Sequence, residues 1–199
     1  MTNPALAYVV AGSEATGGAG FQVDLKTFQQ LGVYGVGTLS CIVAFDPANN
    51  WGHRFHPIPP TLIDEQMEAA LATHPTVRTV KVGMLGTPDT IGTVARNLSS
   101  HDWDNVVVDP VLICKGQEPG AALDTDNALR EKITRFATPK VGEQRVSGAG
   151  CTLAAAVTAE LAKGTSIYDA VKTAKDLVYR GIQARVSAET PFDTVWQGA

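Results

Sequence analysis

Short apolar runs rich in valine recur along this chain, and each is followed by a stretch whose apolar residues keep helical spacing. The runs that predict buried strands cover residues 5–11, 36–45, 77–84 and 105–112. The stretches that predict helices cover residues 21–31, 61–73, 87–98, 124–136, 152–163 and 166–185. Four repeats of strand and helix predict an α/β fold, in which a mainly parallel sheet carries helices on both faces.

The loops that follow the predicted strands are the places to look for chemistry, because ligands of such sheets bind beyond the carboxyl ends of the strands. These loops cover residues 12–20, 45–60, 85–87 and 114–120. Proline, asparagine and glycine punctuate residues 46–60, which predicts a loop throughout. His53 and His56 lie in it without carboxylate or cysteine partners, so loop residues are a better interpretation than metal ligands.

The most informative segment is a glycine turn that runs directly into a strong helix-forming sequence, Ser147-Gly148-Ala149-Gly150-Cys151. Such a turn predicts a helix start with free backbone N–H groups and the positive end of the helix dipole, which together bind anions. Cys151 stands at that helix start, where its thiol is expected to ionise more easily than that of a free cysteine. An anion cradle with a base beside it suits a phosphoryl-transfer enzyme.

Composition narrows the class of protein. The chain has 199 residues, which predicts a single domain, and its net charge of −4 with no basic stripe argues against a nucleic-acid partner. No apolar run approaches the roughly 20 residues that cross a bilayer, and the N-terminus lacks the basic region of a signal peptide. Three widely spaced cysteines fit a reducing compartment, so we expect a cytoplasmic protein.

Four ordered segments resemble the vitamin kinases of the ribokinase superfamily. They are residues 11–27, Val82-Gly83-Met84-Leu85-Gly86, Val107-Val108-Asp109-Pro110-Val111 and Gly148-Ala149-Gly150-Cys151-Thr152. The resemblance implies a ribokinase-like three-layer sandwich, ATP and Mg²⁺ as cofactors, a small-molecule substrate and a homodimer. These kinases phosphorylate either pyridoxal and its vitamers or hydroxymethylpyrimidine.

Two features resemble the pyridoxal kinases of this superfamily more than its pyrimidine kinases. Phe45 offers an apolar contact where the pyrimidine kinases carry an amide side chain. Residues 111–116 resemble the lid of cysteine-bearing pyridoxal kinases, in which the lid thiol, here Cys114, adds to the substrate aldehyde as a hemithioacetal. The neighbouring Lys115 either covers the phosphates or is a solvated lid charge.

The resemblance also implies roles for individual residues. Cys151 is expected to be the general base, and Gly148, Ala149 and Gly150 to donate N–H groups to the transferred phosphoryl group. Ser13 is expected to hydrogen-bond the pyridine ring, and Phe45 and Met84 to form apolar walls. Asp109 either helps the metal and phosphates, directly or through water, or caps a turn. Asp24 is expected to cap or brace the glycine-rich loop.

The chain departs from the family between the predicted helix at 124–136 and the glycine turn. Ten residues, 137–146, replace a longer block, and ten residues cannot hold even one parallel crossover. Either the printed chain joins two pieces of a longer protein at residues 139–140, which we favour, or the block is genuinely absent. Ser147 also stands where the family commonly has histidine. The alternatives to a pyridoxal kinase are a hydroxymethylpyrimidine (phosphate) kinase and an inactive vitamer-binding relative.

Overall fold

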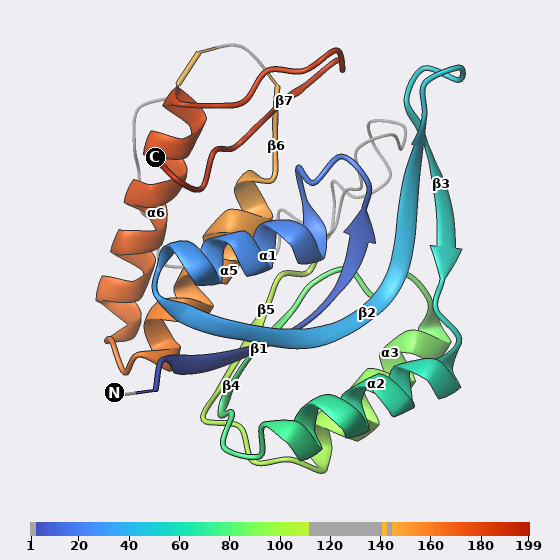
Figure 1. Cartoon of the computed structure of the whole chain (residues 1–199), viewed down its shortest axis with the longest axis vertical. Coiled ribbons are helices and arrows are strands. Elements are labelled where there is room, and N and C mark those ends of the chain that lie inside the picture. The colour runs from blue at the N-terminus through green and yellow to red at the C-terminus, as the bar shows by residue number, and fades with distance from the viewer. Residues whose placement is uncertain (1–2, 112–140, 143–144) are drawn as a thin grey trace, which may run out of the picture.

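The centre of the molecule is a five-stranded sheet in the order β3-β2-β1-β4-β5 (Figure 1). The computed structural model describes residues 3–111, 141–142 and 145–199. The sheet strands are β1 (Ala5–Glu14), β2 (Val33–Asp46), β3 (Gly52–Pro57), β4 (Thr79–Val82) and β5 (Asn105–Val108). β1 lies parallel to β2 and β4, and β4 lies parallel to β5, whereas β3 alone is antiparallel. The predicted mainly parallel sheet is confirmed.

Helices cover both faces of this sheet, which gives the expected three layers (Figure 1). One face carries α2 (Pro60–Thr73) and α3 (Pro88–Ser99), and the other carries α1 (Gly20–Gln30), α5 (Ala149–Ala162) and α6 (Ile167–Gln183). The alternation along β1 divides the core: Tyr8 and Val10 pack toward α2 and α3, and Ala7 and Val9 pack toward α1 and α5. The small residues on the second side let α5 lie close to the sheet.

The prediction that residues 46–60 form a loop throughout was wrong. They form a hairpin whose return strand is β3, paired so that Phe45 lies opposite His53. Pro47, Asn49 and Asn50 mark the turn of this hairpin, where Asn50 and Trp51 both have positive φ. Pro59 and Pro60 instead mark the start of α2. The hairpin carries His53 and Phe55 up beside the carboxyl ends of the parallel strands.

Other differences concern the ends of elements. β1 continues into the glycine-rich loop as far as Glu14, and a short parallel pair, β6 (Val146–Ser147) and β7 (Asp193–Thr194), was not predicted. β5 ends at Val108 rather than at residue 112. The predicted helix at 124–136 and the proposed junction at 139–140 lie outside the described residues.

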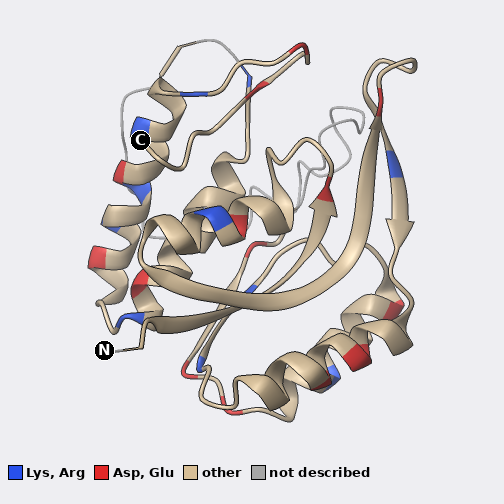
Figure 2. Ribbon diagram, viewed as in Figure 1, with Lys and Arg blue, Asp and Glu red and all other residues tan. Residues whose placement is uncertain are grey.

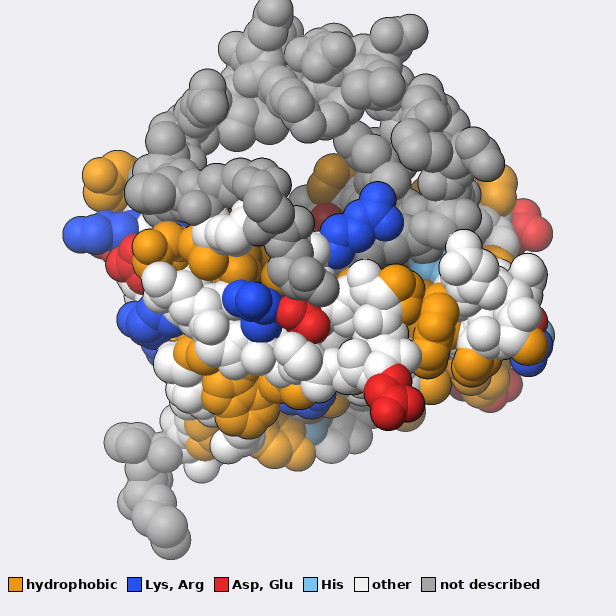
Figure 3. All heavy atoms as spheres, turned by 90° about the horizontal axis from the view of Figure 1, so that it is seen from above, with side chains coloured by type: hydrophobic (Ala, Val, Ile, Leu, Met, Phe, Trp, Pro, Cys, Tyr) orange, Lys and Arg blue, Asp and Glu red, His pale blue; other side chains and the backbone are white. Residues whose placement is uncertain are grey.

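Basic and acidic side chains are interspersed along the ribbon of Figure 2 and over the face drawn in Figure 3. Several are paired at the surface, such as Arg96 with Asp64 at 2.9 Å. Within the described part of the chain, no helix combines the length and the apolar character that crossing a bilayer requires.

Candidate active site

A pocket of about 380 Å³ opens between the carboxyl ends of the parallel strands and the start of α5. Eight residues that the sequence singled out line it together: Ser13, Phe45, Met84, Asp109, Gly148, Ala149, Gly150 and Cys151. The predicted lid residues Cys114 and Lys115 lie outside the described residues. Three ionisable side chains that sequence reasoning missed also line the pocket, namely Glu14, His53 and Lys81.

The start of α5 has the geometry of an anion cradle. Gly148 precedes the helix in the left-handed conformation, with φ of 83°, and no side chain among the described residues caps the first turn. The first N–H groups of a helix have no partners within it, so those of Ala149, Gly150 and Cys151 border the pocket at the positive end of the dipole. A Cβ on Gly148 would lie 2.2 Å from the carbonyl oxygen of Gly18. Only glycine allows this contact between the two turns.

Cys151 lies where two helices begin. Its Sγ accepts a hydrogen bond from the backbone N–H of Gly20, the first residue of α1, at 3.4 Å. Burial nevertheless raises the pKa of the Cys151 thiol, because the nearby Lys81 and the Gly20 N–H only partly offset desolvation. The expectation of an easily ionised thiol was therefore wrong for the free protein, since the sequence does not reveal how deeply the sulfur is buried.

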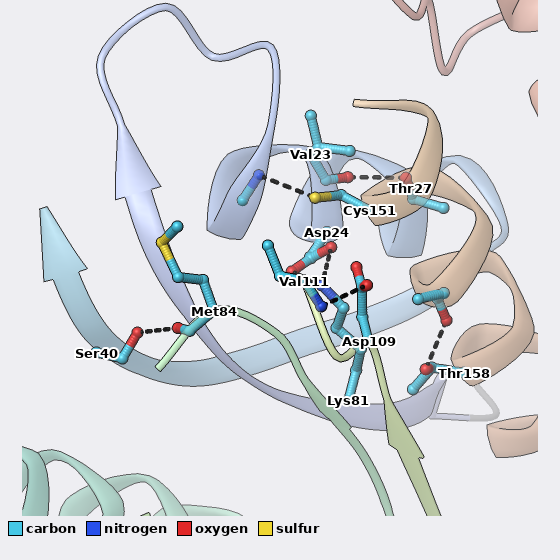
Figure 4. A network of polar contacts seen from close by, with 12 residues as sticks. Val23, Asp24, Thr27, Ser40, Lys81, Met84, Asp109, Val111, Cys151 and Thr158 are labelled. Carbon is cyan, nitrogen blue, oxygen red and sulfur yellow. Dashed lines mark hydrogen bonds and ion pairs between the residues drawn. The ribbon is translucent and has the colours of Figure 1, made fainter. Parts of the chain in front are cut away.

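Below the sulfur lies a buried ion pair between Lys81 of β4 and Asp24 of α1 (Figure 4). The Lys81 Nζ donates to both carboxylate oxygens of Asp24, at 2.8 and 3.0 Å, and the two side chains are 1% and 0% exposed. Burial raises the pKa of Asp24 to about 6 even though Lys81 acts against it. Burial opposes the charge on Lys81, but Asp24, Cys151 and Asp109 outweigh it and raise the pKa of Lys81.

This pair corrects the prediction that Asp24 caps or braces the glycine-rich loop. The brace is Glu14, whose carboxylate accepts hydrogen bonds from the backbone N–H groups of Thr16, Gly18 and Ala19, the last at 2.7 Å. A buried carboxylate with three such donors fixes the loop that faces α5. A lysine between two valines of a buried strand was a readable signal for Lys81, because a charge there needs a partner.

The opposite wall of the pocket is largely apolar. The ring of Phe45 meets the ring of His53 edge-on, with centroids 4.7 Å apart, and lies 5.6 Å from the ring of Phe192. Burial lowers the pKa of His53, which favours the neutral imidazole, although Glu14 acts in the other direction. Met84 completes this wall at the end of β4. Sequence alone could not place His53 here, because its position depends on the hairpin.

Two polar residues remain at the rim. The Ser13 hydroxyl accepts a hydrogen bond from Gln22 Nε2 at 2.6 Å, which leaves its own proton available for a ligand. Asp109 lies just beyond β5, where its N–H donates to the carbonyl of Val82 at 2.8 Å and its carboxylate accepts from the Val111 N–H at 3.5 Å. Within the described ranges, no group of three or more His, Cys, Asp or Glu side chains is arranged so that it could hold a metal ion.

Comparison with known proteins places this geometry in a family. The phosphomethylpyrimidine kinase family matches residues 14–139 and 122–196. The pyridoxine kinase of Bacillus subtilis is 32% identical, with 89% of this chain and 90% of that protein aligned. That alignment spans 244 positions, more than the 199 residues of this chain, so it contains gaps on this side.

Solved structures agree with the sequence match. The Bacillus subtilis pyridoxal kinase, solved as an ADP complex, superposes with a TM-score of 0.85 at 27% identity, covering 99% of this chain and 98% of that one. The Staphylococcus aureus pyridoxal kinase, solved with AMP-PCP and pyridoxal, gives a TM-score of 0.84 at 26% identity, covering 100% and 95%. These likenesses confirm the expected ribokinase-like fold.

Proposed function

This chain belongs to the phosphomethylpyrimidine kinase family, and we propose that it phosphorylates the 5′-hydroxymethyl group of pyridoxal, pyridoxine and pyridoxamine with ATP. One observation carries the proposal: the uncapped start of α5, the Cys151 sulfur and an apolar wall for an aromatic ring line a single pocket. An anion cradle, a base and a ring site are the three parts that phosphorylation of an aromatic alcohol requires.

In this reaction the alcohol oxygen of the substrate attacks the γ-phosphorus, and the bond from that phosphorus to the bridging oxygen of ADP breaks. Cys151 reacts in its ionised form, which is the minor form in the free protein because burial raises the pKa of the thiol. The thiolate takes the proton of the alcohol, so that the sulfur ends as a thiol. The N–H groups of Ala149 and Gly150 donate to the oxygens of the transferred group, where charge develops in the transition state. Gly148 allows these donors to approach because it carries no side chain.

The aromatic ring of the vitamer lies between Phe45 and Met84, with the Ser13 hydroxyl donating to the pyridine nitrogen. This wall favours the B6 vitamers over hydroxymethylpyrimidine, because Phe45 has no amide to pair with the amino group and ring nitrogen of a pyrimidine. Cys114 as a partner of the aldehyde and Lys115 as a cover for the phosphates remain predictions that rest on the family resemblance.

Magnesium fits this site as a companion of the nucleotide rather than as an ion held by a protein cage. Asp109 lines the pocket and is the carboxylate at the end of β5, so it is placed to hold a water of a hydrated ion. Magnesium bound with ATP supplies positive charge to the phosphates. The N–H groups at the start of α5 suit the negative charge of the phosphates, and the Asp109 carboxylate suits the positive charge of the hydrated ion.

The test is a comparison of turnover on pyridoxal and on hydroxymethylpyrimidine, each measured as ADP release with Mg·ATP. We expect phosphorylation of pyridoxal to be the faster reaction. The second candidate is hydroxymethylpyrimidine (phosphate) kinase, the activity in the name of the matching family. Faster turnover of the pyrimidine would favour that candidate over ours.

A third reading, an inactive vitamer-binding relative, follows from the short segment at residues 137–146. We propose instead that the chain is one ribokinase-like domain in which two pieces of a longer sequence meet at residues 139–140. The overlapping family matches and the gapped alignment support this junction. Sequencing the gene across it decides the matter: an uninterrupted junction, together with no ATP binding by calorimetry, would favour the inactive relative.

We propose that the protein is a cytoplasmic homodimer that binds neither nucleic acid nor membrane. The net charge of −4 and the interspersed basic and acidic residues (Figure 2) support the proposal that it does not bind nucleic acid. The family resemblance supports the dimer. Light scattering behind a sizing column tests it, and a monomer at micromolar concentration would contradict it.

A further inference from the structure

The floor of the pocket contains a cation for which the proposed reaction has no role so far. Lys81 lines the pocket, yet it is almost wholly buried because β4 is covered on both faces of the sheet. Among the described lining residues, it is the only one that carries a positive charge at neutral pH. A buried lysine is costly unless it is paired, so its position beneath the partly buried Cys151 sulfur needs a physical reason.

The ion pair with Asp24 uses only part of the hydrogen-bonding capacity of Lys81. Lys81 has three N–H donors, and Asp24 accepts two of them. Asp24, Lys81, Asp109 and Cys151 gather where α1, β4, the end of β5 and α5 meet (Figure 4). The lysine therefore has charge and a donor to offer to a group on the pocket side.

The charges around Cys151 show why a cation is needed there. The groups that face the pocket or its floor from the surrounding elements are Glu14, Asp24, His53, Lys81 and Asp109. Three are carboxylates and one is a neutral imidazole, so a sulfur anion would meet mostly negative charge. Lys81 favours ionisation of Cys151, whereas burial, Asp24 and Asp109 oppose it.

We propose that Lys81 is a positioning residue of the phosphoryl-transfer site: its ammonium group, held in place by Asp24, is the fixed counter-charge of the Cys151 sulfur. This role rests on the proposed function, in which that sulfur accepts the proton of the alcohol. Asp24 fixes the ammonium group and keeps the buried pair neutral, at the expense of some attraction between Lys81 and the sulfur.

The experiment measures the sulfur itself rather than turnover. Cys151 in the free protein is alkylated with iodoacetamide across a pH series, and its modified peptide is counted by mass spectrometry. In K81M, the rate at about pH 8 should fall about tenfold, because the opposite charge that favours the thiolate is lost. In D24N, the rate should rise, because a carboxylate that opposes ionisation is removed.

Opposite signs separate this role from a structural one, since damage to the packing would change both variants in the same direction. K81M leaves Asp24 buried without a partner, so D24N/K81M serves if the single variant does not fold. The double variant should be alkylated more slowly than the wild type but faster than K81M, because Lys81 influences the sulfur more than Asp24 does. The matched control is K163M, which removes a lysine paired with Glu160 at the far end of α5 and should leave the profile unchanged.

The proposal is overturned if D24N/K81M gives the wild-type profile, or if D24N and K81M shift that profile in the same direction. Because alkylation needs neither ATP nor vitamer, these outcomes do not depend on the kinase reaction. A wild-type protein without kinase activity but with the expected shifts would overturn the proposed function while leaving the charge pairing intact. If both hold, D24N/K81M should also lower kcat with little change in KM for pyridoxal.

Discussion

Replacing Gly148 by alanine should damage both stability and catalysis. Gly148 has φ of 83°, a conformation that costs an alanine about 1 kcal/mol relative to glycine. Its new Cβ would also lie 2.2 Å from the Gly18 carbonyl oxygen, so α5 and the glycine-rich loop must move apart by about 1 Å. Overpacking of this kind adds about 1–3 kcal/mol, which gives a total loss of about 2–4 kcal/mol in the free energy of unfolding.

The chain offers a matched control at the other end of the same helix. Gly164 has the same φ of 83°, but a Cβ there would meet nothing within 4 Å. Gly164→Ala should therefore lose only the conformational part, about 1 kcal/mol, and keep full activity. In Gly148→Ala, displacement of the N–H donors by about 1 Å should lower kcat about a hundredfold.

Urea unfolding measures the free energy of unfolding of Gly148→Ala and of Gly164→Ala. ADP release with saturating pyridoxal and Mg·ATP measures kcat of the same two variants. Equal stability losses in the two variants would refute the close approach of Gly148 to Gly18. Equal kcat values, with Gly148→Ala folded, would refute the view that the start of α5 binds the transferred phosphoryl group.

Three further predictions concern the site and the core. Cys151→Ala should lower kcat by about a hundredfold or more while pyridoxal still binds by calorimetry, and a change below about threefold would move the role of base to another group. Phe45→Gln should shift the ratio of turnover toward hydroxymethylpyrimidine, and an unchanged ratio would contradict its role in reading the ring. Burial raises the pKa of Tyr8 to about 12, above its ordinary value of 10.0, so the neutral phenol stabilises the fold. That contribution of about 3 kcal/mol is complete below pH 10.0 and is lost as pH rises through about 12. Urea unfolding across this pH range should show a steeper loss of stability in the wild type than in Tyr8→Phe, and equal pH dependence would contradict the shift.

Much of the fold was predictable because the spacing of apolar residues and the positions of turn-forming residues are local properties of a sequence. Valine runs predicted four strands of the sheet, and the helix predicted from residue 166 agrees with α6, which Ser166 caps by accepting a hydrogen bond from the Asp169 N–H. The hairpin was not predictable in this way. Residues 52–57 carry histidines, an arginine and a proline, and they form a strand only because β2 offers them an open edge.

The site was predictable where backbone chemistry decides it and unpredictable where burial does. The glycines at residues 148 and 150 predict a helix start with free N–H groups from the local sequence alone. The pKa of Cys151 depends instead on desolvation and on Lys81, a residue 70 positions away in the chain. Glu14 as the brace of its own loop likewise becomes visible only when the loop closes around its carboxylate.

The most direct measurement of the central claim is a single-turnover reaction of the protein with pyridoxal and Mg·ATP, followed by the absorbance of pyridoxal 5′-phosphate and by ADP. We expect one ADP for each pyridoxal 5′-phosphate in the wild type and in Gly164→Ala, and a rate at least about a hundredfold lower in Gly148→Ala and Cys151→Ala. Undiminished phosphorylation by the last two variants, or none by a wild-type protein that binds both pyridoxal and ATP, would contradict the claim that phosphoryl transfer takes place at the start of α5.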